Sequence, residues 1–219
     1  MSTAEATQQS WMTADPLLRR AAAAFTVWMI FWTTVILWAY GPQNFLWLCN
    51  IAQFIVLYSL WTGNRLLLSS QAGTVVFVGL FWTPDFLLGA ASGGAWAAFT
   101  EYMFNPERPF LARATSLYHI FLPILILWAL HRIGYDHRGP WLQTALAVVV
   151  LPATWLFTEA ERNVNWLTEP AGVEQVWMSD PVFVLVMLVL YPLLLFWPGH
   201  GLVLLVRRLL TRLGKPPAA

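Results

Sequence analysis

Long apolar runs separated by short polar stretches dominate the pattern of this chain. A bilayer core about 30 Å thick is crossed by about 20 helical residues at about 1.5 Å each. Runs of roughly this length predict six transmembrane helices, at residues 21–40, 44–61, 66–90, 114–133, 141–157 and 181–197, the last with a basic extension to 210.

Most connections between these runs are short and rich in helix-breaking residues. They contain Gly41-Pro42, Thr62-Gly63-Asn64 and Gly139-Pro140. Short loops make sequence neighbours antiparallel neighbours, which predicts one helical bundle over 21–210 with tails at 1–20 and 211–219. The two longer connections, 91–113 and 158–180, fall on the same side of a six-helix bundle, and long loops more often carry function than short ones.

Composition places the chain in one class. Hydrophobic residues make up 58% of the chain and charged residues 11%, with a mean hydropathy of +0.60. A soluble protein carries about a quarter charged residues, so the sequence indicates an all-α integral membrane protein surrounded by lipid. The formal net charge of +1 excludes nucleic acid as a partner. A single cysteine, Cys49, rules out an internal disulfide, and the sequence leaves a protein partner or a homo-oligomer open.

Arginine and lysine distribution predicts the orientation. Residues 1–15 are polar and the first apolar run is long, so we expect no cleaved signal peptide and a retained first span. With the N-terminus inside, nine basic residues lie on the inner side and three, Arg108, Arg113 and Arg162, on the outer side. Basic residues favour the cytoplasmic side, so the prediction is a bundle with both termini inside.

The few polar residues within the spans fall near one membrane face. Cys49, Asn50, Asp85 and His119 share a predicted level near the outer side, where an ionisable side chain marks a candidate site. A thiol and an imidazole form the minimal nucleophile and base pair, so Cys49 and His119 are the candidate catalytic residues, with Asp85 or Asn50 to orient the imidazole. Alternatively, Cys49 is a small packing residue and His119 is hydrogen-bonded to a neighbouring helix.

Asp85 has a second possible role because it follows a proline. Thr83-Pro84-Asp85 interrupts the third span in this interpretation, and the carbonyls that proline frees could build a binding site. The alternative is a simple kink, with Asp85 reaching headgroup water or pairing with Arg108 or Arg113.

The long outer loop contributes a second group of candidates. Asn163, Asn165 and Trp166 could line a polar entrance to the bundle, or the carboxamides could satisfy backbone groups in a buried turn. Glu159 and Glu161 are two carboxylates in the same loop, which is too little to predict a divalent cation site.

No cofactor is expected. Two histidines on different helices can hold haem, and His131 with His200 would be the pair to consider. The sequence has no CxxCH motif. His200 follows Pro198-Gly199 as a candidate helix cap, and His131 belongs to a wet loop, so the haem interpretation is not adopted.

Several motifs resemble a family of uncharacterised bacterial integral membrane proteins. The chief one is NFLWLCNIA at 44–52, joined by Tyr102-Met103-Phe104, Ser116-Leu117-Tyr118-His119 and NVNW at 163–166. The resemblance covers roughly 41–200 and implies a multi-pass protein of a bacterial inner membrane. Asn50 stands where family members usually have Asp, which weakens any role for this position as a charged orienting group.

Cys49 and His119 are also distantly similar to the Thr or Cys and His pairs of multi-span lipid enzymes. These include the androgen-regulated hydrolases of fatty acid esters of hydroxy fatty acids and a cysteine-dependent acyltransferase. The resemblance implies an ester or thioester lipid substrate that enters from the outer leaflet. Two hypotheses follow: an intramembrane lipid acyltransferase or hydrolase, and a non-catalytic accessory subunit or small ligand-binding carrier. A transporter ranks third because no pair of related halves is evident.

Overall fold

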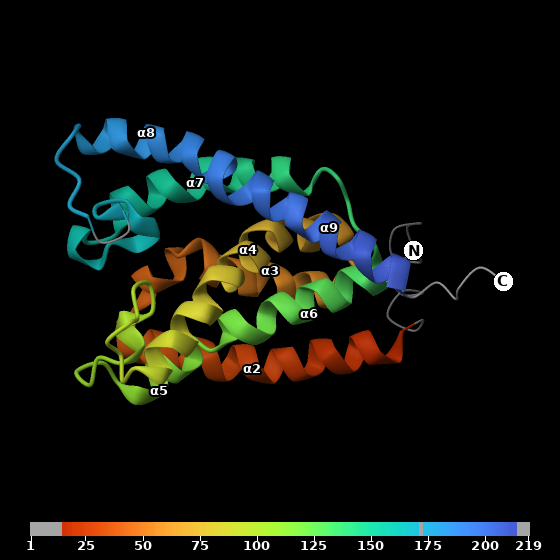
Figure 1. Cartoon of the computed structure of the whole chain (residues 1–219). Coiled ribbons are helices and arrows are strands. Elements are labelled where there is room, and N and C mark those ends of the chain that lie inside the picture. Colours follow the sequence, from red (N-terminus) through yellow and green to blue (C-terminus); the bar gives the residue numbers. More distant parts are fainter. Residues whose placement is uncertain (1–14, 171–172, 214–219) are drawn as a thin grey trace.

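The structure, a computed structural model, describes residues 15–170 and 173–213 (Figure 1). Every regular element in these residues is a helix, which confirms the predicted all-α class. The main helices are α2 (Pro16–Tyr40), α3 (Leu48–Thr62), α4 (Arg65–Ala91), α5 (Phe110–Thr115), α6 (Tyr118–Ile133), α7 (Gly139–Phe157), α8 (Asp180–Tyr191) and α9 (Trp197–Leu213). Short 3-10 helices lie at η1 (Pro42–Leu46), η2 (Glu101–Met103), η3 (Ala160–Arg162) and η4 (Val164–Trp166), and a π-helical segment, η6 (Pro192–Phe196), joins α8 to α9.

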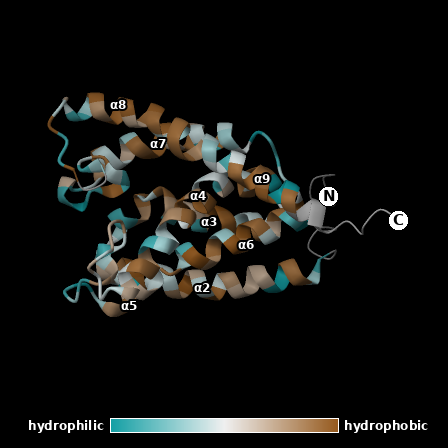
Figure 2. Ribbon diagram, in the orientation of Figure 1, coloured by the Kyte–Doolittle hydropathy of each residue, from teal (hydrophilic) through white to brown (hydrophobic). Residues whose placement is uncertain are grey.

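Among the described residues, five helical stretches are long and apolar enough to cross a membrane. They are Pro16–Tyr40, Arg65–Ala91, Phe110–Ile133, Gly139–Phe157 and Asp180–Leu209. Hydrophobic residues run along the bodies of these helices, and hydrophilic ones gather toward the ends of the bundle (Figure 2). The other predicted span forms α3, whose 15 residues extend about 22 Å at about 1.5 Å per residue.

The first two helices begin at positions that the apolar pattern did not predict. α2 starts at Pro16, five residues before 21, because Asp15 caps it by accepting hydrogen bonds from Leu17 N and Leu18 N. α3 starts at Leu48 rather than at 44. Residues before it form η1, whose Asn44 carbonyl accepts from Trp47 N and also from the Asn50 side chain.

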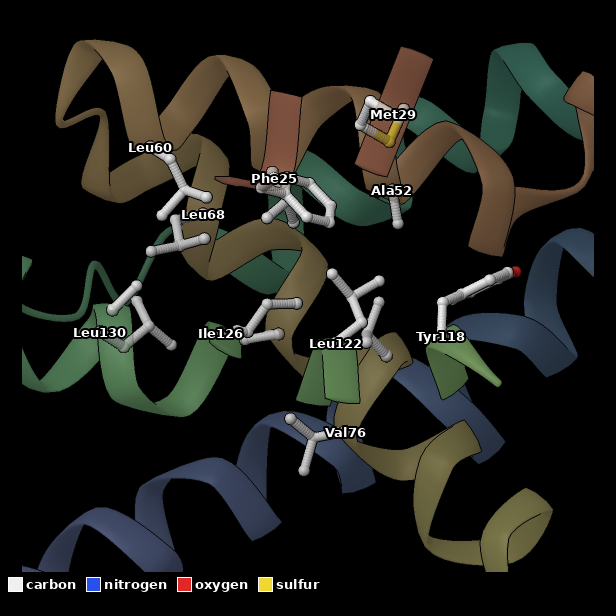
Figure 3. Close-up of a cluster of buried hydrophobic side chains, with 14 of the residues drawn as sticks. Phe25, Met29, Ala52, Leu60, Leu68, Val76, Tyr118, Leu122, Ile126 and Leu130 are labelled. Carbon is white, nitrogen blue, oxygen red and sulfur yellow. The ribbon is translucent and has the colours of Figure 1, made fainter. Parts of the chain in front are cut away.

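α4 is the centre of the bundle. It packs against α3, α6, α7 and α9, while α2 packs chiefly on α3. Buried apolar side chains from α2, α3, α4 and α6 form one core cluster, which Figure 3 shows with Phe25, Leu68, Leu122 and others meeting between the helices. A second cluster joins α7, α8 and η6 through side chains such as Leu151, Phe183 and Phe196.

The predicted interruption at Thr83-Pro84-Asp85 is wrong. α4 continues through Pro84 to Ala91. Proline is tolerated within membrane helices because neighbouring groups can satisfy the carbonyl that it frees. The helical irregularity lies instead at Pro192, where the chain adopts the π-helical turn η6.

Candidate functional site

Cys49 and Asn50 lie in the first turn of α3, beside the start of α6. The Cys49 Sγ atom lies 4.0 Å from Asn50 Oδ1, and the thiol also lies beside the Tyr118 hydroxyl. Asn50 is buried, accepts a hydrogen bond from Tyr118 Oη at 2.9 Å and donates one to the Asn44 carbonyl at 2.7 Å. Asn50 therefore links η1, α3 and α6 by neutral hydrogen bonds.

His119 is the second residue of α6 and lies in a stack of rings. Its ring centroid is 4.1 Å from that of Tyr118 and 5.0 Å from that of Trp82. The Nδ1 atom lies 2.9 Å from the Ser116 carbonyl. A carbonyl can only accept, so this contact assigns the proton to Nδ1 and leaves the lone pair of the neutral ring on Nε2.

The structure brings Cys49 and His119 into one neighbourhood without pairing them. Tyr118 lies between them, with its hydroxyl near Cys49 and Asn50 and its ring against His119. Among the hydrogen bonds of the described residues, none joins the thiol to the imidazole. We call Cys49, Asn50, Tyr118 and His119 the outer polar cluster, after the side that the sequence predicts for them.

Asp85 serves a different part of the molecule. Its Oδ1 accepts from Ala98 N at 3.0 Å, and its Oδ2 accepts from Thr100 N at 2.8 Å and Thr100 Oγ1 at 2.7 Å. Asp85 therefore anchors the loop that follows α4.

Neither arginine expected as an alternative partner forms an ion pair with Asp85 in the described residues. Arg113 donates to the carbonyls of Met103 and Arg108. The ion pairs of the described residues include no pair between Asp85 and either Arg108 or Arg113.

Asn165 and Asn163 hold the backbone of the loop between α7 and α8, which we call the outer loop after its predicted side. Asn165 is 2% exposed, and its Oδ1 accepts from Leu48 N while its Nδ2 donates to Leu46 O and Thr154 Oγ1. Asn163 Oδ1 accepts from the backbone of Thr168 and Glu169. These contacts correspond to the buried-turn alternative. Trp166 stacks on Phe99 of the other long loop, with ring centroids 5.8 Å apart.

Asn165 caps α3 from a position far away in the sequence. The residue before α3, Trp47, has no capping side chain, and an unpaired N–H at a helix start is costly when it is removed from water. Leu48 N is instead paired with Asn165 Oδ1 at 2.9 Å, across 117 positions. The N-terminus of α3 is thus completed by the loop between α7 and α8.

A second set of buried polar side chains escaped the sequence analysis. Gln53, Gln71 and Gln143 are each at most 1% exposed. Gln71 Nε2 donates to Gln143 Oε1 at 2.8 Å, and Trp28 Nε1 donates to Gln53 Oε1 at 2.9 Å. The sequence signal for this set was glutamine within the predicted spans. Burying a carboxamide in hydrocarbon is unfavourable unless it is hydrogen-bonded, so each glutamine indicated a partner on another helix.

The histidines considered for haem occupy unlike surroundings. His200 is 2% exposed, with its Nδ1 atom 2.5 Å from the Tyr135 hydroxyl, whereas His131 is exposed. His200 lies inside α9, not at a helix break as expected.

Of the two carboxylates considered for a cation, Glu159 is engaged by arginine. Glu159 pairs with Arg162 at 2.7 Å, and this guanidinium lowers the pKa of the Glu159 carboxyl. Across residues 15–170 and 173–213, His, Cys, Asp and Glu form no group of three or more suited to a metal ion.

Comparison of the chain with protein-family models, curated proteins and solved structures finds no match. The arrangement of its own residues therefore carries the functional argument.

Proposed function

We propose that this protein is a non-catalytic membrane bundle, either an accessory subunit or a small ligand-binding carrier. In this proposal the outer polar cluster holds α3 and α6 together. The observation that carries this proposal is that the thiol and the imidazole each contact a group other than the other. The Cys49 thiol faces Asn50 Oδ1, and the His119 Nδ1–H donates to Ser116 O.

The surrounding contacts support a structural role for the cluster. Asn50, Tyr118 and Asn165 all pair with groups at the junction of η1 and α3, where the chain leaves regular helix inside the bundle. Irregular backbone at membrane depth requires internal hydrogen-bond partners. Asn50 of the cluster and Asn165 of the loop between α7 and α8 supply them, and Tyr118 holds Asn50 in place, so these polar residues are accounted for without a reaction.

One observation favours a second candidate, an intramembrane lipid acyltransferase or hydrolase. Cys49 and His119 share one cluster, and the lone pair of the imidazole is on Nε2. In such a reaction, Nε2 would take the thiol proton while Cys49 attacks the acyl carbonyl, and the proton would leave with the alcohol or thiol. Water or an acceptor alcohol would then release the acyl group. His119 would first have to turn toward the sulfur past Tyr118.

Acyl-enzyme capture separates the two candidates. Purified protein is incubated with an alkyne-labelled long-chain acyl thioester and with a labelled fatty acid ester lipid. The expected result is no hydroxylamine-sensitive adduct on Cys49 and no release of fatty acid, in wild type or in Cys49→Ala. An adduct that disappears in both Cys49→Ser and His119→Ala would overturn the non-catalytic proposal.

Thermal unfolding of the same variants tests the structural role directly. Cys49→Ala is expected to lower stability by about 1 kcal/mol or less, because only a weak sulfur contact is lost. His119→Ala is expected to cost more, since two ring contacts and a hydrogen bond disappear. Unchanged unfolding midpoints in both variants would contradict the structural role.

The topology belongs to the same proposal. We place the chain in a bacterial inner membrane as six spans with both termini inside, as a member of the uncharacterised family that its motifs resemble. In support, α2 begins and α9 ends at the same end of the bundle (Figure 1), the arrangement that an even number of crossings would give. η1 and α3 together supply the additional crossing between α2 and α4.

A further inference from the structure

An apolar groove of about 550 Å³ opens between α2 and α6. Its walls come from positions 21, 24, 25 and 28 of α2 and 121, 124, 125 and 128 of α6, and every one of these side chains is apolar. Both sets follow the spacing of one helical face. We call this hollow the α2–α6 groove.

The groove exists because two small side chains face bulky ones. Ala21 and Ala24 leave room on α2, whereas Trp28 meets Phe121 edge to face at one end, with ring centroids 5.0 Å apart. α2 packs chiefly on α3 rather than on α6. A hollow between transmembrane helices that is lined only by carbon has the shape and chemistry of an acyl-chain site.

The other end of the groove is basic. Trp128 lines the groove, and the Arg132 guanidinium lies 5.0 Å above its ring centroid. Arg19 and Arg20 are exposed and directly precede Ala21. The Arg132–Asp15 ion pair at 2.7 Å brings these ends of α2 and α6 together.

The charges at this end do not cancel among the described residues. Asp15 is the acid engaged there: its Oδ1 caps α2 and its Oδ2 accepts from Arg132. Arg19, Arg20 and Arg132 thus give this end of α2 and α6 three guanidinium groups against one carboxylate, a net positive charge. Basic clusters beside transmembrane helices attract anionic headgroups.

We propose that the α2–α6 groove binds one anionic phospholipid, with an acyl chain along the groove and its headgroup at Arg19, Arg20 and Arg132. The apolar walls account for the chain and the three arginines account for selection by net charge. Asp15 holds Arg132 over Trp128, so this guanidinium is positioned before the lipid arrives. The groove does not include the outer polar cluster, so this inference does not depend on the proposed function.

Native mass spectrometry of the purified full chain tests the site. The protein in detergent is titrated with phosphatidylglycerol and, separately, with phosphatidylethanolamine carrying the same acyl chains. We expect one tightly retained phosphatidylglycerol, bound on the order of tenfold more tightly than phosphatidylethanolamine, because each nearby arginine favours the anionic headgroup. Equal retention of the two lipids would overturn the selection by charge.

Two alanine variants provide a matched pair for the groove. Ala24 lines it, whereas the neighbouring Ala23 is also exposed and lies outside its lining. Ala24→Leu is expected to abolish the retained lipid, and Ala23→Leu to keep it. Equal retention in both variants would mean that the lipid is bound elsewhere. A change in the dimer fraction caused by Ala24→Leu alone, with no retained lipid in wild type, would assign the groove to a second copy of the chain.

The arginines are tested without disturbing the ion pair. Arg19→Gln combined with Arg20→Gln leaves Arg132 and Asp15 in place and is expected to reduce the preference for phosphatidylglycerol by several-fold, with little change in phosphatidylethanolamine retention. An unchanged preference would refute their part in headgroup binding. Unfolding midpoints of all four proteins confirm that the variants are folded.

Discussion

Asn165 shows how much of this fold depends on single polar side chains. Its backbone lies in the left-handed region, with φ of 54°, which asparagine tolerates better than most residues. Its side chain pairs with Leu48 N, Leu46 O and Thr154 Oγ1, and its own carbonyl accepts from Tyr191 Oη. One residue thus connects the outer loop with α3, α7 and α8.

Asn165→Gly is expected to lower the free energy of unfolding by about 3 kcal/mol. Glycine keeps the left-handed backbone accessible, so the loss reports the side-chain hydrogen bonds and the buried backbone groups left without partners. The measurement is the thermal unfolding midpoint in detergent. Asn64→Ala is the comparison, because Asn64 makes one exposed cap contact, to Leu67 N, worth about 1 kcal/mol. Equal losses in the two variants would contradict the role given to Asn165.

Asp136 provides a pH-dependent contact outside the membrane-spanning segments. Its carboxylate accepts from Arg138 Nε at 3.0 Å and Nη2 at 2.8 Å, and the Arg138 guanidinium lowers the pKa of Asp136 from 3.8 to about 2. Because the pKa of Asp136 is lower in the folded state, the contact stabilises the fold fully at a pH above the ordinary pKa of 3.8. This stabilisation is lost as the pH falls toward the folded-state pKa of about 2.

The corresponding prediction concerns Asp136→Asn. Its unfolding midpoint is expected to lie below that of wild type at pH 7, with the difference shrinking as the pH falls from about 4 to about 2. Midpoints measured across this range provide the test, with Glu107→Gln in an exposed loop as control. A difference that is constant with pH would show that ionisation of Asp136 is not its source.

At the scale of elements, α4 and α9 approach closely through glycine. A Cβ atom on Gly199 would lie 2.1 Å from the Gly73 carbonyl oxygen, and one on Gly73 would lie 2.5 Å from His200 Cδ2. Small residues let membrane helices pack backbone to backbone, which matters where no water-driven association acts between them.

Gly199→Ala is therefore expected to destabilise the bundle by about 2–3 kcal/mol, since the clash is with backbone that cannot rotate away. Gly201→Ala is the matched control two positions along α9, where a Cβ atom has no neighbour within 4 Å. The control is expected to leave stability unchanged or to raise it, because alanine favours helix. The test compares unfolding midpoints. A loss in Gly201→Ala equal to that in Gly199→Ala would disprove the close-packing argument.

At the scale of the whole molecule, α3 decides the topology. Five stretches satisfy the length and hydropathy of a span, and α3 is a shorter apolar helix of 15 residues. With α3 as a crossing, the two termini lie on the same side of the membrane, and without it they lie on opposite sides.

Reporter fusions in a bacterial host decide between these topologies. Green fluorescent protein at either terminus is expected to fluoresce, and alkaline phosphatase is expected to be active only when inserted in the outer loops, for example near Glu107 or Glu169. This result follows from the excess of arginine on the inner side. Active phosphatase at the C-terminus with a fluorescent N-terminal fusion would show an odd number of crossings.

Hydropathy and spacing by themselves determined the class of this molecule. Apolar runs predicted the all-α bundle and five of its long helical stretches because burial in hydrocarbon imposes a strong, local constraint on composition. The polar residues within and between these runs also drew attention to Cys49, Asn50, His119 and Asn165. The helix starts at Pro16 and Leu48 were not predicted, because a helix cap depends on single side-chain contacts.

Only the tertiary structure decided what the polar residues touch. Sequence spacing relates side chains along one helix, but Cys49 and His119 lie on different helices, and Tyr118 between them could be placed only by packing. The same holds for Asn165 and Leu48, which lie 117 positions apart, and for the groove between α2 and α6. Contacts between helices depend on their relative rotation and separation, quantities that the order of residues in each helix does not contain.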